Sequence, residues 1–253
     1  MIINKPIGME PLVSEVKKIC ENSEVYRLTP CKPNHFIIYL NKGEGRSTAL
    51  EYISNMFKAN GVLDFYTGLD DHIEFTFDGT YNNYIEGEQL FEDAAIYENA
   101  FAAPFGIDAA MLCSHKNEDH WNMFTNMIST KAKSAFFVFF ISLIPSKNEE
   151  ELIKTVKKHT KGRITEIVIP AYSKSDYNSI AIRKVKDCVT VCEDKKTKTA
   201  ISNFLDSQNI NSVTKAISAA ELIVTKAKCF RTEMVIDSEC FNVSEKERQS
   251  YEK

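Results

Sequence analysis

The sequence contains no long hydrophobic run. Its most apolar stretch, residues 135–145, is far shorter than the roughly 20 residues that a helix needs to cross a bilayer. The first residues also lack the basic start and continuous apolar segment of a signal peptide. We therefore expect a cytoplasmic protein without a membrane segment.

The cysteine patterns of disulfide frameworks and zinc knuckles are also missing. The seven cysteines are odd in number, are scattered over 253 residues and form no C-x-x-C pair. The chain likewise has no H-E-x-x-H zinc motif and no G-x-S-x-G nucleophile elbow. Function must therefore be inferred from the order of the elements and from the loops between them.

The chain carries no excess of positive charge, because its formal net charge is -4. We therefore do not expect a nucleic-acid partner. The charge is uneven, however: no Lys or Arg lies between Ala59 and His115, whereas cations dominate residues 131–198. Opposite charges on separate surfaces favour head-to-tail contact, so a homo-oligomer or a protein partner is one hypothesis. Two solvated faces are the alternative.

Compact apolar runs alternate with amphipathic segments through the first two thirds of the chain. The expected strands are residues 36–40, 72–77, 105–112, 135–144 and 164–169. The expected helices lie near residues 9–22, 47–60, 82–99, 117–132 and 147–160. This alternation predicts an α/β fold, a P-loop NTPase-like three-layer sandwich with a five-stranded, mostly parallel sheet.

The pattern changes after Tyr172, where we expect only helices. Segments near residues 174–187, 195–206 and 211–228 have helical periodicity and predict a small helical lid domain. The expected organisation is an N-terminal helix and linker, an α/β core, a helical lid and a C-terminal tail. Their ranges are 1–34, 35–172, 173–230 and 231–253.

A glycine-containing turn links the first expected strand to the following helix. Residues 40–48 read L-N-K-G-E-G-R-S-T, which resembles the phosphate-binding pattern G-x-x-x-x-G-K-S/T. Leu40 replaces the first glycine and Arg46 replaces the lysine, while Glu44 adds a carboxylate where phosphates would lie. A tight strand-to-helix turn that binds nothing would use the same glycines, and this alternative stays open.

An acidic residue, Asp108, lies at the end of the third expected strand, where P-loop proteins place a carboxylate that helps to hold Mg²⁺. The next residue is Ala109, although many ATP hydrolases have a second acid there. Efficient hydrolysis is therefore not expected. A cap of the following turn is the alternative role for Asp108.

With this order of elements, the chain resembles the AAA+ ATPase family over about residues 34–230 and looks like a divergent bacterial member. The resemblance implies ATP or ADP with Mg²⁺ as ligands. It implies catalytic roles for Asp108 and for Arg163, the latter as an arginine finger, and Mg²⁺ contacts from Ser47 and Asp108. Ser142 or Ser146 would be the polar sensor, and Lys215 is the cation nearest to the absent lid arginine. The implied nucleotide-binding residues are Asn41, Lys42, Gly43, Glu44, Gly45, Arg46, Ser47, Thr48, Ser142 and Lys215.

Three functional hypotheses agree with these features of the sequence. The first is an AAA+-like nucleotide-binding protein with weak or absent hydrolysis that acts through nucleotide-linked protein assembly. The second is a pseudo-ATPase that serves as an interaction scaffold with an empty loop. A small-molecule kinase is less favoured because no arginine-rich lid follows the central strands.

Overall fold

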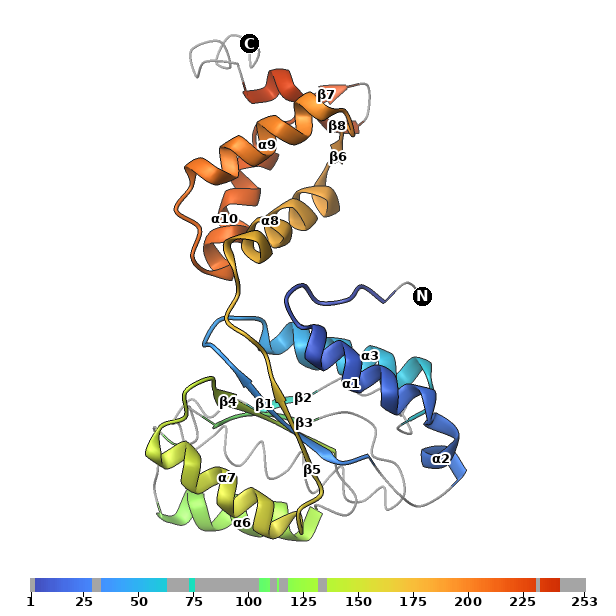
Figure 1. Ribbon diagram of the computed structural model, residues 1–253, viewed down its shortest axis with the longest axis vertical. Helices are drawn as coiled ribbons and strands as arrows, with labels where there is room; N and C mark the ends of the chain where they lie inside the picture. Colours follow the sequence, from blue (N-terminus) through green and yellow to red (C-terminus); the bar gives the residue numbers. More distant parts are fainter. Residues whose placement is uncertain are drawn as a thin grey trace. The chain divides into compact units, whose positions relative to one another are not determined.

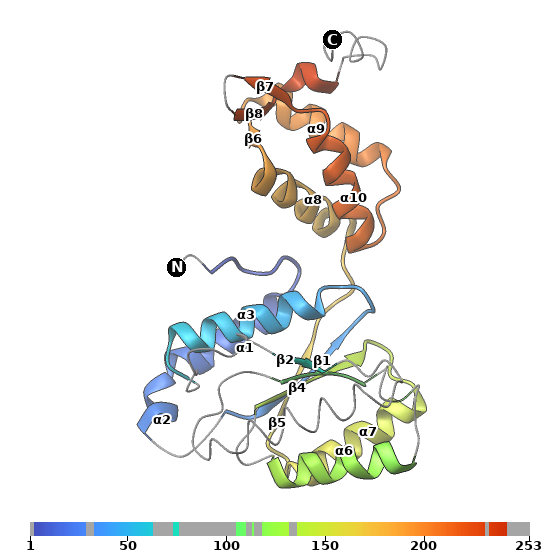
Figure 2. The same cartoon turned by 180° about the vertical axis from the view of Figure 1, so that it is seen from behind.

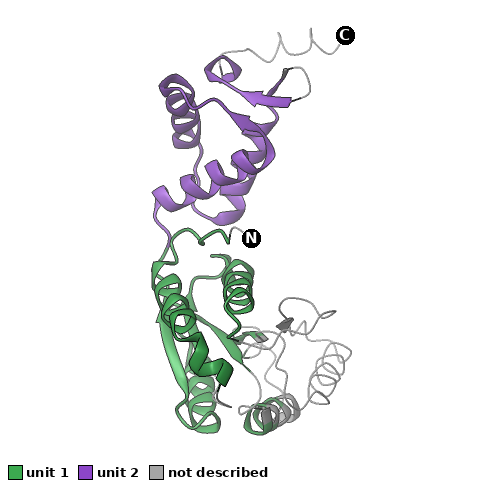
Figure 3. Ribbon diagram, turned by 90° about the vertical axis from the view of Figure 1, so that its right-hand side faces the viewer, with its two compact units in different colours: residues 1–171 green, residues 172–253 purple. Residues whose placement is uncertain are grey.

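The computed structural model divides into two compact units, residues 1–171 and residues 172–253 (Figure 3). It describes residues 3–28, 33–62, 73–75, 105–109, 113, 118–131, 136–230 and 233–241. The helix predicted near residues 82–99 lies outside these ranges. Within the described residues, no helix has both the length and the hydropathy needed to cross a membrane.

A parallel sheet forms the centre of the first unit. Its strands are β1 (His35–Leu40), β2 (Ile73–Phe75), β3 (Phe105–Asp108), β4 (Phe137–Ser142) and β5 (Ile164–Val168). Their order across the sheet is β2-β3-β4-β1-β5, and every pairing is parallel. The predicted parallel α/β core is thus confirmed. The third strand is shorter than predicted, because it ends at Asp108 and Ala109 is already helical.

Helices cover both faces of this sheet (Figures 1 and 2). α1 (Glu10–Glu21) and α3 (Arg46–Ala59) lie on one face, and α6 (Glu118–Lys131) and α7 (Lys147–His159) lie on the other. The short helix α2 (Ser23–Leu28) follows α1. This three-layer arrangement explains why β1 and β4 read as continuous apolar runs, since both of their faces are buried.

Large side chains hold the layers together. On the α3 face, Phe36, Phe57 and Phe136 are completely buried and meet edge to face, with ring centroids 5.1–6.5 Å apart. Gly106 of β3 also faces α3, because a Cβ added there would lie 2.6 Å from a methyl carbon of Leu50. This close approach and the aromatic cluster fix α3, and with it the loop that precedes α3.

The second unit contains strands as well as helices, so the prediction that strands end after Tyr172 is wrong. Its helices are α8 (Lys174–Cys188), α9 (Lys195–Ser207) and α10 (Val213–Val224). β6 (Thr190–Val191), β7 (Lys228–Phe230) and β8 (Glu233–Ile236) form a second sheet, followed by the 3₁₀ helix η1 (Ser238–Phe241). Part of the predicted C-terminal tail is therefore structured. These strands are only two to four residues long, too short to show an alternating pattern.

Candidate functional site

The topology of the first sheet places a switch point at the carboxyl ends of its strands. β1 and β4 are neighbours, yet the chain after β1 enters α3 on one face and the chain after β4 enters α7 on the other (Figure 1). Open parallel sheets bind ligands at such a switch point. Residues 41–45 and residues 143–146 are the two connections that leave this point.

The connection after β1 is a tight turn that needs both of its inner glycines. The Glu44 amide donates a hydrogen bond of 3.1 Å to the Asn41 carbonyl, and Gly43 has a φ of 80°. Gly45, the N-cap of α3, has a φ of 84°, and its carbonyl accepts from the Ala49 amide at 2.9 Å. L-residues with side chains rarely adopt such angles, so the two glycines fix the shape of the loop.

The start of α3 offers backbone amides to an anion. Gly45 has no side chain to cap the helix, and the first turn contains no acidic residue. The described start of α7 differs, because the Ser146 hydroxyl accepts from the Glu149 amide. The first amides of a helix and its positive dipole end attract anions such as phosphate. α3 begins at Arg46, one residue before the predicted start, and Ser47 and Thr48 are exposed in its first turn.

Glu44 departs from its expected place. The sequence suggested that its carboxylate would lie among the phosphates, but only 5% of this residue is exposed. The neighbouring Lys42 and Gly43 are exposed instead. The Glu44 carboxylate therefore does not lie on the open surface of the loop, where it would repel an anion most directly.

Arg46 and Asp108 form an ion pair, although they are 62 positions apart in the sequence. Arg46 is the first residue of α3 and Asp108 is the last residue of β3. Their side chains are 31% and 11% exposed, so the pair is partly shielded from water. The structure thus brings together the residues at the lysine position of the loop and at the end of the third strand, and each neutralises the other.

Ser142 lies beside the loop, as its predicted role requires. It is the last residue of β4 and pairs in register with Leu40, the residue directly before the loop. Its amide donates to Glu149 Oε1 at 2.9 Å. Ser146, the alternative sensor, instead caps α7.

Glu149 is a residue of this region that the sequence analysis missed. Its carboxylate accepts from the amides of Ser142 and Ser146, at 2.9 and 2.8 Å, and only 3% of the residue is exposed. Burial acts to raise its pKa, but the hydrogen bonds from Ser146 and Ser142 outweigh it and hold the pKa below the usual value. Glu149 therefore fixes the turn after β4. The pattern Ser146-x-x-Glu149, a capping box, could have revealed it.

Arg163 lies at the other end of the sheet. It directly precedes β5, and its carbonyl accepts from the amide of His35, the first residue of β1. The loop follows the last residue of β1, about 17 Å further along the strand. Arg163 therefore does not reach the loop of its own chain. Its predicted catalytic role stays a prediction that concerns the loop of a second copy of the chain.

Lys215 belongs to the second unit. It is the third residue of α10, and its amide donates to the capping Ser212 hydroxyl at 3.2 Å. The loop of residues 41–48 belongs to the first unit. Its predicted contact with a nucleotide stays a prediction.

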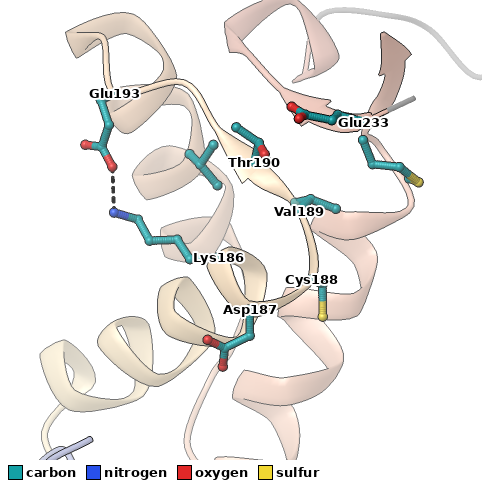
Figure 4. A pocket seen from close by; sticks show the side chains of 9 residues that line it. Lys186, Asp187, Cys188, Val189, Thr190, Glu193 and Glu233 are labelled. Atoms are coloured by element: carbon teal, nitrogen blue, oxygen red, sulfur yellow. Dashed lines mark hydrogen bonds and ion pairs between the residues drawn. The ribbon is translucent and has the colours of Figure 1, made fainter. Parts of the chain in front are cut away.

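An open hollow of about 480 Å³ in the second unit is a weaker candidate site (Figure 4). Two of its charged groups, Lys186 and Glu193, are paired: Lys186 Nζ lies 2.7 Å from the Glu193 carboxylate, and Lys198 Nζ lies 2.6 Å from the same carboxylate. The hydrogen bonds from these two lysines lower the pKa of Glu193 to about 2. The residues that line it include none of the predicted site residues, so we place the candidate site at the loop of residues 41–48.

Comparison with known proteins supports the fold of this site. No family model and no curated protein sequence matches the chain. Among solved structures, a replication initiator DnaA bound to AMPPCP and single-stranded DNA is similar, with a TM-score of 0.50 and 16% identity. The match covers 88% of this chain and 62% of that one, so this chain spans less than two thirds of the DnaA chain. The chain therefore shares its fold with that DnaA chain. At this identity the likeness concerns the fold alone.

Proposed function

We propose that the protein binds ATP or ADP through the loop of residues 41–48, with weak or absent hydrolysis. The observation that carries the proposal is the loop itself, with two glycines in the left-handed region at the switch point of the sheet. The uncapped start of α3 and the guanidinium of Arg46 add attraction for phosphates. The similar DnaA structure holds a nucleotide analogue, which agrees with this ligand class.

Weak hydrolysis follows from the residues around Asp108. Ala109, the next residue, is completely buried and has no carboxylate with which to orient an attacking water. Asp108 itself already pairs with Arg46. Arg163 lies at the opposite end of the sheet and does not reach this loop. We therefore expect the protein to bind nucleotide and to hydrolyse it slowly or not at all.

Thermal unfolding with and without millimolar ATP or ADP tests this proposal. A ligand that binds only the folded state increases the free energy of unfolding by mass action, by roughly 2.7 kcal/mol at a ligand concentration of 100 times the Kd. The unfolding midpoint rises as a consequence. We expect a rise in the wild-type protein that Arg46→Ala abolishes. Arg27→Ala is the matched control, because Arg27 is an exposed arginine of α2 that pairs with Glu24. An unchanged rise in Arg46→Ala would remove Arg46 from the site.

One observation favours a second candidate, a pseudo-ATPase scaffold. The positive charge of Arg46 is already neutralised by the Asp108 carboxylate, so Arg46 needs no nucleotide phosphate as a counter-ion. In that case neither ATP nor ADP would change the unfolding midpoint of the wild-type protein. The same experiment therefore separates the two candidates.

We further propose that nucleotide acts through protein assembly, either between copies of the chain or with a protein partner. The support is the uneven charge along the sequence, with acidic residues but no Lys or Arg between Ala59 and His115, and many cations from Lys131 to Lys198. Sedimentation velocity should show larger species with ATP at low salt, and salt should reverse the change because it screens charge. A monomer at every salt and nucleotide concentration would contradict self-assembly.

The similar DnaA structure contains single-stranded DNA, which weakens the prediction against a nucleic-acid partner.

A further inference from the structure

The residues predicted to hold Mg²⁺ do not fit that ion. P-loop sites hold Mg²⁺ with the hydroxyl that follows the loop cation and with an acid at the end of a strand, here Ser47 and Asp108. Ser47 is exposed in the first turn of α3, but the Asp108 carboxylate is paired with the Arg46 guanidinium. A divalent cation on that carboxylate would lie beside a fixed positive charge and be repelled by it.

The shape of the arginine side chain offers an alternative to the metal. A guanidinium carries five N–H donors in a planar fork, and Arg46 contacts Asp108 through Nη1. A fork of five donors can bind two anions at once, so a second anion can be held while the pair with Asp108 persists. Arg46 also begins α3, next to the helix amides that attract phosphate.

Resting on the proposed nucleotide binding, we propose that Arg46 takes the place of Mg²⁺ in this site. Its guanidinium bridges the Asp108 carboxylate and the phosphate chain, a connection that the metal makes in ordinary P-loop sites. The preferred ligand is then a nucleotide free of divalent cation. A lysine could not do this equally well, since its ammonium is a compact point charge without the planar fork.

The test is a titration of ATP into the wild-type protein by calorimetry, once with EDTA and once with excess MgCl₂. We expect binding in EDTA at least as tight as in Mg²⁺. Arg46→Lys should weaken binding in EDTA by about tenfold, the loss of a charge-assisted hydrogen bond, and Mg²⁺ should restore part of it. Arg27→Lys, a matched exchange at an exposed arginine, should leave both affinities unchanged.

A second variant separates a bridging role of Asp108 from a metal-binding role. Asp108→Asn removes a negative charge near the phosphates, so we expect affinity in EDTA to be equal or higher. If Asp108 instead held Mg²⁺, the same variant would lose affinity in MgCl₂. Wild-type binding that is tenfold tighter with Mg²⁺ would overturn this inference and leave the proposed function intact. No heat of binding in either buffer would overturn both.

Discussion

Replacement of Glu149 by alanine is expected to lower the free energy of unfolding of the first unit by about 3 kcal/mol. The change removes the acceptor of two backbone amides, those of Ser142 and Ser146, at a residue that is 3% exposed. Donors that stay buried without an acceptor cost more than the hydrogen bond itself contributed. Urea denaturation followed by circular dichroism measures the effect.

Two comparisons make the Glu149 prediction specific. Glu149→Gln keeps one acceptor oxygen and should lose about half as much stability. Asp176→Ala removes the equivalent capping box from α8 in the second unit, where the hydrogen bonds are exposed, and should cost only about 1 kcal/mol. An Asp176→Ala loss as large as that of Glu149→Ala would contradict the role given to burial.

The same carboxylate gives a pH dependence with a defined sign. Because the folded-state pKa of Glu149 is lowered, its ionisation stabilises the fold above the pKa of the unfolded chain. That stability is lost as the pH falls through the folded-state pKa. Glu149→Gln should therefore unfold with a shallower dependence on pH in the acid range than the wild-type protein.

Replacement of Phe57 by alanine is expected to cost about 4 kcal/mol. Phe57 is completely buried, and its ring centroid lies 5.3 Å from that of Phe136 and 6.5 Å from that of Phe36. The alanine variant leaves a cavity between α3 and the sheet that neighbouring side chains can fill only in part. A loss below about 1 kcal/mol in urea denaturation would show that this cluster does not anchor α3.

Phe57→Leu is the matched variant for function. It keeps much of the buried volume and should cost about 1–2 kcal/mol. Phe57 lies in the last turn of α3 and Arg46 in the first, so the leucine variant should keep the rise in midpoint that nucleotide causes. Loss of that rise would mean that packing at Phe57 controls the loop.

The sequence was sufficient to predict the core because its signals are strong and local. β1 is a run of five apolar residues after His35, and a turn with two glycines follows it, so the strand, the loop and the helix could all be placed. β4 was found for the same reason. A strand buried on both faces carries few polar residues, which makes its sequence distinctive.

The contacts that shape the site could not be predicted in the same way. The pairing of Arg46 with Asp108 depends on which strands are neighbours, and nothing in residues 40–48 encodes this order. The pairing of the short strand β6 with β8 joins residues 45 positions apart, which local patterns do not record.

The most direct test of nucleotide binding at residues 41–48 is an NMR titration of protein labelled with ¹⁵N only in glycine. The chain has nine glycines, so each amide signal can be followed separately. On addition of ATP we predict the largest shifts at Gly43 and Gly45, with Gly61 and Gly162 unmoved as internal references. If Gly43 and Gly45 stay in place at saturating ATP, the loop does not hold phosphate and the proposed function is wrong.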